Sequence, residues 1–158
     1  MKKLFLSVLF LSIIRVALLA VNPPIYIAFQ WHMHQPIYQP GETVIETHNS
    51  GVLSYNLYDV FTSRTGPYTS WPANAVNKML SFPHAGAQVS FSGSLVENLN
   101  VLEANGIGFS NWKSSWNNMI SKKTSLGNQR LEMVGFGYHH PLMALIDEAD
   151  IEKQIAKH

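Results

Sequence analysis

Three short apolar runs, separated by longer segments of mixed character, give this chain its pattern. They occupy residues 25–29, 86–91 and 131–136, and polar side chains follow each of them within a few residues. Runs of this length are typical of strands, and the nearly unbroken apolar character of the first is typical of a strand buried on both faces of a parallel sheet. The pattern therefore predicts one strand in each run.

Helical patterns fill the segments between these runs. Pro72 suits the first turn of a helix, where its missing N–H costs no hydrogen bond, and apolar residues recur at helical spacing as far as Leu80. The same reasoning predicts further helices, at 95–104, at 112–123, from 142 to 158 and, within the polar stretch 39–68, at 53–61. Strands that alternate with helices predict βαβ units, and hence an α/β fold with a parallel sheet.

The first twenty residues have the pattern of an export signal. Two lysines precede an apolar run at 4–14, and small alanines follow it. Arg15 interrupts the hydrophobic stretch, and a central arginine opposes membrane insertion by roughly 2.5–3.5 kcal/mol. We therefore expect a signal peptide at 1–20, a secreted or periplasmic mature chain at 21–158, and no stable membrane span beyond the signal.

Composition narrows the class of protein. The chain has 158 residues, of which 46% are hydrophobic and 13% charged, so it suits one globular domain. Its net charge is +1 and its lysines and arginines are scattered, so we expect no nucleic-acid partner. The absence of cysteine excludes disulfides, zinc–thiolate sites and thiol nucleophiles.

Candidate chemistry gathers where the predicted strands end, and ligands of parallel α/β folds bind at those ends. Trp31, His32, His34 and Gln35 follow the first strand, and His140 follows the third. Three imidazoles can bind zinc, so a metal-dependent hydrolase is one interpretation. Aromatic rings beside groups that donate and accept hydrogen bonds also suit a carbohydrate site. For His32 and His34 taken singly, simple packing is equally favoured.

Other aromatic and histidine residues divide between site and packing. Trp71 and two tyrosines, Tyr38 and Tyr138, are further candidates for contact with sugar rings. Trp112 and Trp116 lie at helical spacing, which favours the core. We expect the remaining histidines to lie in surface loops or at the terminus: His48, His84 and His158.

The segment Trp31-His32-Met33-His34-Gln35-Pro36 resembles the opening motif of glycoside hydrolase family 57, in which a strand ends in His-x-His-Gln-Pro. Three further segments resemble family motifs in the same order along the chain. They are Gly66-Pro67-Tyr68-Thr69, the Ser-Gly-Ser-Leu turn at 92–95, and the strand from Leu131-Glu132 that leads to His140. The resemblance spans residues 25–158.

The resemblance implies an incomplete (β/α)7 barrel of the glycoside hydrolase/deacetylase type, with about three parallel strands and intervening helices. It also implies α-glucan (starch, pullulan or maltodextrin) as the partner, no cofactor, no metal, and retaining chemistry by a Glu nucleophile and an Asp acid/base. In the family, both carboxylates lie on later strands, in a region that would lie beyond His158. We therefore expect a truncated or inactive form that keeps substrate-binding residues only: Trp31, His32, His34, Gln35, Trp71 and His140.

Two alternatives remain open. One is a non-catalytic carbohydrate-binding protein that has kept the aromatic and histidine cluster, and the other is the metal-dependent hydrolase. Because three strands leave open sheet edges, we also expect the isolated chain to be marginally folded.

Overall fold

The computed structural model describes residues 25–158, so the expected signal peptide lies outside the described residues. Its strands are β1 (Gln30–Met33), β2 (Ala87–Phe91) and β3 (Leu131–Met133). Its helices are α2 (Val44–Ser50), α3 (Leu57–Thr62), α4 (Thr65–Thr69), α5 (Trp71–Lys78), α6 (Gly93–Ala104), α7 (Ser114–Met119), the 3-10 turn η1 (Met143–Leu145) and α8 (Glu148–Lys157).

The three strands form one parallel sheet in the order β1-β2-β3, which confirms the predicted α/β class and strand direction. Gln30 of β1 is level with Gln88 of β2, which is level with Glu132 of β3. Each strand-to-strand connection carries helices, as a parallel crossover requires.

The first strand lies further along the chain than its apolar run indicated. The ladder with β2 begins at Gln30, whereas residues 25–29 have no regular secondary structure and expose their large side chains, with Ile25 91% exposed. The register continues residues 25–28 past the amino end of β2, where residues 81–84 form turns and a bend rather than a partner strand. The prediction of a buried strand at 25–29 was therefore wrong.

Among the helices, α5 and α6 confirm the prediction, and their ends follow local sequence signals. Pro72 lies in the first turn of α5, and Ser92 caps α6 by accepting a hydrogen bond from Leu95 N (3.1 Å).

Two other predicted helices were too long. The helix at 112–123 is reduced to α7, because Asn111 adopts a left-handed φ of 53° and the chain turns after Met119 toward the bridge of Lys123 with Gln129. The helix at 142–158 is divided into η1 and α8, because Asp147 has an extended backbone and begins α8 anew.

The long polar stretch is largely helical, which the sequence analysis missed except for α3. Helix α2 begins with a capping box, in which Thr43 Oγ1 accepts from Glu46 N while a Glu46 carboxylate oxygen accepts from Thr43 N. It ends at Gly51, whose φ of 68° suits glycine. Its T-x-x-E spacing was the signal that could have revealed it.

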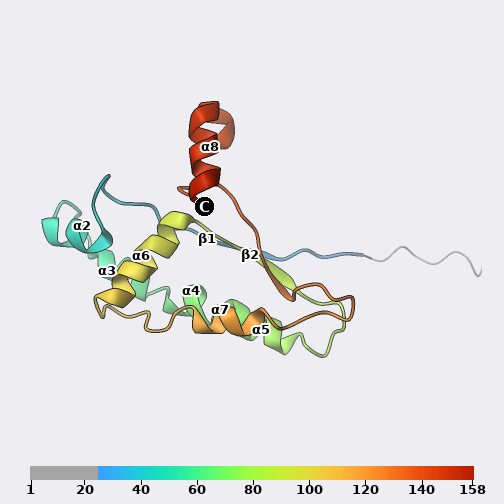
Figure 1. Cartoon of the computed structure of the whole chain (residues 1–158). Coiled ribbons are helices and arrows are strands. Elements are labelled where there is room, and N and C mark those ends of the chain that lie inside the picture. Colours follow the sequence, from blue (N-terminus) through green and yellow to red (C-terminus); the bar gives the residue numbers. More distant parts are fainter. Residues whose placement is uncertain (1–24) are drawn as a thin grey trace, which may run out of the picture.

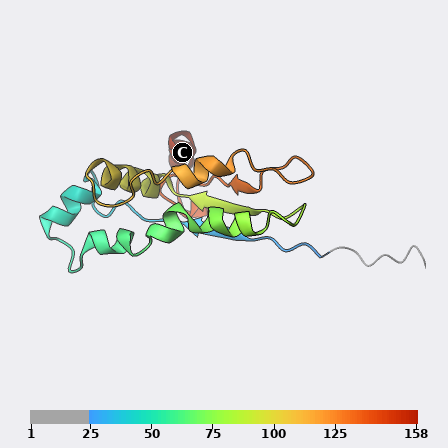
Figure 2. The ribbon, with the colours of Figure 1, turned by 90° about the horizontal axis from the view of Figure 1, so that it is seen from below.

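The two faces of the sheet differ. Alternation along the strands puts Met33, Val89 and Phe91 on one face, where all are buried against the hydrophobic core. Helices α5 and α7 lie side by side beneath this face, whereas α8 stands on the opposite side of the sheet (Figure 1, Figure 2). The second face carries Gln88 and Glu132, both exposed. Helices α5 and α7 therefore cover the apolar face, whereas Gln88 and Glu132 leave part of the second face open.

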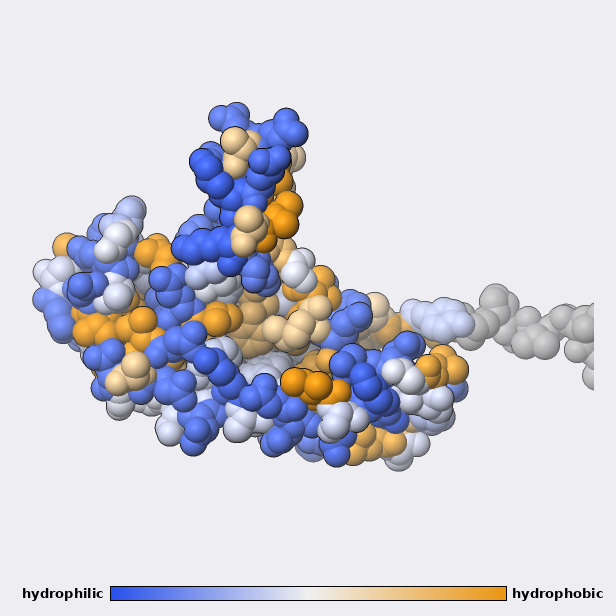
Figure 3. All heavy atoms as spheres, viewed as in Figure 1, coloured by the Kyte–Doolittle hydropathy of each residue, from blue (hydrophilic) through white to orange (hydrophobic). Residues whose placement is uncertain are grey.

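Hydrophobic groups remain on the surface around the body and at the base of α8 (Figure 3). The exposed large side chains include Phe29, Met133, Leu142 and Leu145, with Leu145 78% exposed. Within residues 25–158, none of the helices has the length and apolar character needed to cross a membrane.

Candidate functional site

Three histidines meet at the carboxyl end of the sheet. His32 lies in β1, His34 follows it on the same face by strand alternation, and His140 comes from the loop after β3. The ring centroid of His140 lies 4.5 Å from that of His32 and 5.0 Å from that of His34. We call these three residues the histidine cluster.

The strand register fixes the orientation of the first ring. His32 is level with Ser90 of β2, and His32 Nδ1 lies 2.8 Å from Ser90 Oγ. Ser90 is 1% exposed, so its hydroxyl depends on this hydrogen bond. The other ring nitrogen of His32 is left for a ligand or water.

The second ring has an unused polar atom. His34 Nδ1 is buried and has no hydrogen-bond partner within the described residues. Burial lowers the pKa of both His32 and His34, and the neighbouring His140 lowers each further. Both imidazoles are therefore neutral at pH 7, and a neutral imidazole can donate at one nitrogen and accept at the other.

The third ring reaches the cluster through an uncommon backbone conformation. His140 has a φ of 59°, in the left-handed region, and its N–H donates to Gly137 O (2.8 Å). The resulting tight turn carries the imidazole back over β1 and β2. Strain of this kind recurs at functional sites.

Two residues that the sequence analysis did not select complete the surroundings of the cluster. Phe136 packs its ring 5.2 Å from His32 and 4.9 Å from His140. His158 is exposed at the terminus, as expected, and it also places Nε2 2.9 Å from Phe91 O and its ring 5.8 Å from Phe136. Period-two alternation along the third apolar run could have identified Phe136, whereas no local pattern indicates the return of His158.

Gln35 supports the site and has no free amide atom. Its Nε2 donates to Tyr68 Oη (3.0 Å), and its Oε1 accepts from Tyr38 Oη (2.5 Å). Burial raises the pKa of Tyr38 to about 12, so this hydroxyl remains protonated and able to donate. In the described structure, Gln35 holds the loop after β1.

The two predicted tryptophans lie apart from the cluster. Trp31 is level with Val89 on the helix-covered face, half-buried against the hydrophobic core. Trp71 begins α5, is 64% exposed, and lies against Gly66, where an added Cβ would come within 2.3 Å of its ring. Their contact with sugar remains a prediction that the histidine cluster does not support.

Bonded carboxylates and metal-binding groups are absent from the surroundings of the cluster within the described residues. Among residues 25–158, no carboxylate forms a hydrogen bond or ion pair with His32, His34 or His140. No group of three or more His, Cys, Asp or Glu in this part of the chain is arranged to hold a metal ion.

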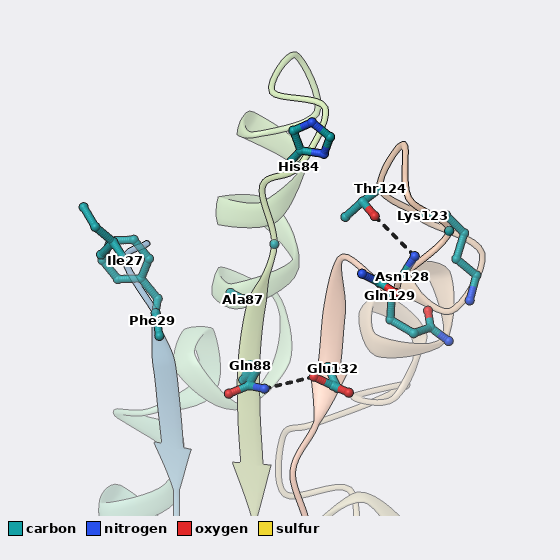
Figure 4. Close-up of a pocket in the computed structure, with 13 residues that line it drawn as sticks. Ile27, Phe29, His84, Ala87, Gln88, Lys123, Thr124, Asn128, Gln129 and Glu132 are labelled. Atoms are coloured by element: carbon teal, nitrogen blue, oxygen red, sulfur yellow. Dashed lines mark hydrogen bonds between the residues drawn. The ribbon is translucent and has the colours of Figure 1, made fainter. Parts of the chain in front are cut away.

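A hollow of about 700 Å³ lies at the opposite, amino end of the strands (Figure 4). Gln88 Nε2 donates there to Glu132 Oε2 (2.9 Å), and Ile27 and Phe29 stand along its β1 side (Figure 4). Because parallel folds bind ligands at the carboxyl end, we assign the site to the histidine cluster and not to this hollow.

The histidine cluster falls within a family match. Residues 28–158 match the model of glycosyl hydrolase family 57. This chain belongs to glycosyl hydrolase family 57.

Two known proteins are similar to this chain. An alpha-amylase of Niallia circulans is 32% identical over 129 residues, which cover 78% of this chain and 10% of that protein. The crystal structure of 4-alpha-glucanotransferase from Thermococcus litoralis is 22% identical with a TM-score of 0.46, covering 81% of this chain and 15% of that chain. The chain thus spans about a tenth of the length of the curated relative that it matches.

Proposed function

We propose that residues 25–158 supply the sugar-contacting part of the active site of a retaining family 57 glycoside hydrolase acting on α-glucan. His32, His34 and His140 would form hydrogen bonds with hydroxyl groups of one sugar ring. The observation that supports this proposal is the convergence of the three imidazoles at the carboxyl end of the sheet, with centroid separations of 4.5, 5.0 and 6.3 Å.

The chemistry of the cluster suits hydroxyl recognition. Sugar hydroxyls both donate and accept, as does a neutral imidazole, and the lowered pKa of His32 and His34 keeps those rings neutral. Ser90 already forms a hydrogen bond with one nitrogen of His32, and this residue is exposed.

We propose that the sheet is one part of a (β/α)7 barrel of the glycoside hydrolase/deacetylase type. The open edges at β1 and β3 and the uncovered polar face agree with a segment of barrel wall whose inner face is polar.

Retaining hydrolysis needs two carboxyl groups about 5–5.5 Å apart across the scissile bond. Among the described residues, no carboxylate is bonded to the cluster. We therefore expect this polypeptide alone to bind sugar without cleaving it.

Calorimetric titration of the 158-residue chain with maltotetraose tests the proposal. We expect binding without release of shorter sugars, and a dissociation constant raised roughly three- to tenfold by His34→Ala, the loss of about one hydrogen bond. His48→Ala is the matched control, since His48 lies in α2 and stacks on Tyr58 at 3.7 Å. Equal affinity in wild type and His34→Ala would contradict the proposal.

We also propose that the chain is exported, with residues 1–20 as the signal. The support is the order of two lysines, an apolar run and small residues at the start of the sequence. Fractionation of expressing cells tests this proposal: protein confined to the cytoplasm, and unchanged in location when residues 1–20 are deleted, would contradict it.

A further inference from the structure

The turn of α6 from Ser94 to Asn98 lies between the two loops that carry the histidine cluster. Ser94, Glu97 and Asn98 are spaced i, i+3 and i+4, so their side chains share one side of the helix. Ser94 is fully buried and Asn98 is 2% exposed. Buried polar groups of this kind are retained when each has a partner, so the identity of those partners is informative.

On one side, this turn holds the loop after β1. Ser94 Oγ lies 2.7 Å from Gln35 O, and Asn98 Nδ2 donates to Pro36 O (2.9 Å). These two carbonyls belong to the residues directly after His34. Two side chains of α6 therefore fix the backbone from which the His34 imidazole projects.

The hydroxyls at the start of α6 form a directed chain. A carbonyl oxygen can only accept, so the Ser94 proton goes to Gln35 O. Ser92 Oγ, 3.1 Å from Ser94 Oγ, then supplies the proton between the two hydroxyls while it accepts from Leu95 N. Each proton in this series of hydrogen bonds has one acceptor, so the position of the Gln35 carbonyl is well determined.

On the other side, the same turn holds the loop after β3. Ser94 N donates to Tyr138 O (3.2 Å), and Tyr138 Oη donates to Glu97 Oε2 (2.8 Å). The tyrosine ring lies directly on Gly93, where an added Cβ would come within 2.0 Å of Tyr138 Cδ2. Tyr138 is two residues before His140, so its attachment fixes where the left-handed turn begins.

We infer that the turn of α6 from Ser94 to Asn98 is a clamp that sets the distance between His34 and His140, with Ser94, Asn98 and the Glu97–Tyr138 pair as positioning residues. The clamp joins the two histidine-bearing loops through one rigid helical turn instead of through a direct bond between them. Its consequence for sugar binding rests on the proposed function, whereas its geometry does not.

Glu97→Ala is the sharpest test, because Glu97 is exposed and its loss leaves the packing of Tyr138 on Gly93 in place. We expect the His140 ring to leave its place beside His34, which proton NMR of the histidine rings would show as changed signals for both. The pKa of His34 should rise toward its ordinary value, since the charge of His140 would no longer oppose its protonation.

Three further variants separate positioning from general damage. Tyr138→Phe removes the hydroxyl and should reproduce the effect of Glu97→Ala. Glu97→Gln keeps an acceptor for the hydroxyl and should restore the wild-type histidine signals. Tyr55→Phe, at a tyrosine 50% exposed in the loop before α3, should leave them unchanged.

Maltotetraose binding completes the test. We expect Glu97→Ala to raise the dissociation constant about tenfold, with Glu97→Gln close to wild type. If the wild-type chain binds no sugar while the histidine signals still move in Glu97→Ala, the proposed function fails and the clamp stands. Histidine signals and His34 pKa that are the same in wild type, Glu97→Ala and Tyr138→Phe would overturn the clamp.

Discussion

The two faces of the sheet differ in their surroundings, although the same strands form both. On the covered face, Val89 is fully buried and Phe91 is 3% exposed, with the Phe91 ring 5.0 Å from that of Trp116. On the open face, Gln88 and Glu132 are exposed and make one hydrogen bond to each other. Neighbouring residues of one strand therefore meet a packed core and open solvent.

Because of this difference, we expect the covered face to contribute most of the folding stability and the open face to carry the binding site. Burial of apolar area is the main favourable term in folding, and it is concentrated on the face that the helices cover. The open face gains little from burial, yet it carries the histidine cluster at its carboxyl end. Substitutions on the two faces should consequently have effects of different kinds.

The largest expected effect is on the covered face. Phe91→Ala should lower the free energy of unfolding by about 3–5 kcal/mol, because it removes a buried ring that contacts Trp112 and Trp116. Gln88→Ala, three residues earlier on the open face, should change it by less than about 0.5 kcal/mol. Urea denaturation followed by tryptophan fluorescence measures the free energy of unfolding of both variants. An equal decrease in the two variants would contradict the difference between the faces.

An intermediate effect is expected where the open face has a buried polar group. Ser90→Ala should cost about 1 kcal/mol, the net value of one hydrogen bond, because His32 is exposed and can bond to water instead. The same substitution at the exposed Ser63 is the control. If Ser90→Ala lowered the free energy of unfolding as much as Phe91→Ala, the surroundings of the histidine cluster would be packed like the core.

The smallest expected effect is on pH dependence. Because the folded-state pKa of His32 and His34 is lowered, the unfolded chain binds more protons near and below the ordinary value, so stability is lost as pH falls from about 7 toward 5. The His32→Gln/His34→Gln variant should lose part of this dependence, and His139, whose pKa burial also lowers, should retain the rest. Urea midpoints at pH 7.5 and 5.5 measure the difference, and the same dependence in the variant would contradict it.

The fold was predictable where local signals and tertiary contacts agree. The apolar run at 86–91, Pro72 and the helical pattern at 95–104 all indicated elements that the structure contains. The run at 25–29 failed because a strand needs a partner, and the partner register begins only at Gln30. Helix α2 was missed because its polar composition hid a capping box that spacing alone reveals.

The sequence predicted those site residues that lie at the ends of strands. His32, His34 and His140 were selected because they follow strands, and parallel strands bring their ends together. Trp31 was misplaced because the shift of β1 by several residues moved it into the strand, where alternation turns it to the core. The contacts of α6 with both loops could not be predicted, because they join residues about 40 to 60 positions apart.

Histidine NMR of the chain during addition of maltotetraose tests the central claim most directly. Selective labelling of the imidazole carbons reports all seven histidines at once, and His48 and His84, outside the cluster, provide internal controls. We expect saturable shifts of the His32, His34 and His140 signals, with the His48 and His84 signals unmoved. Shifts confined to His84, in the hollow at the amino end of the sheet, would contradict it.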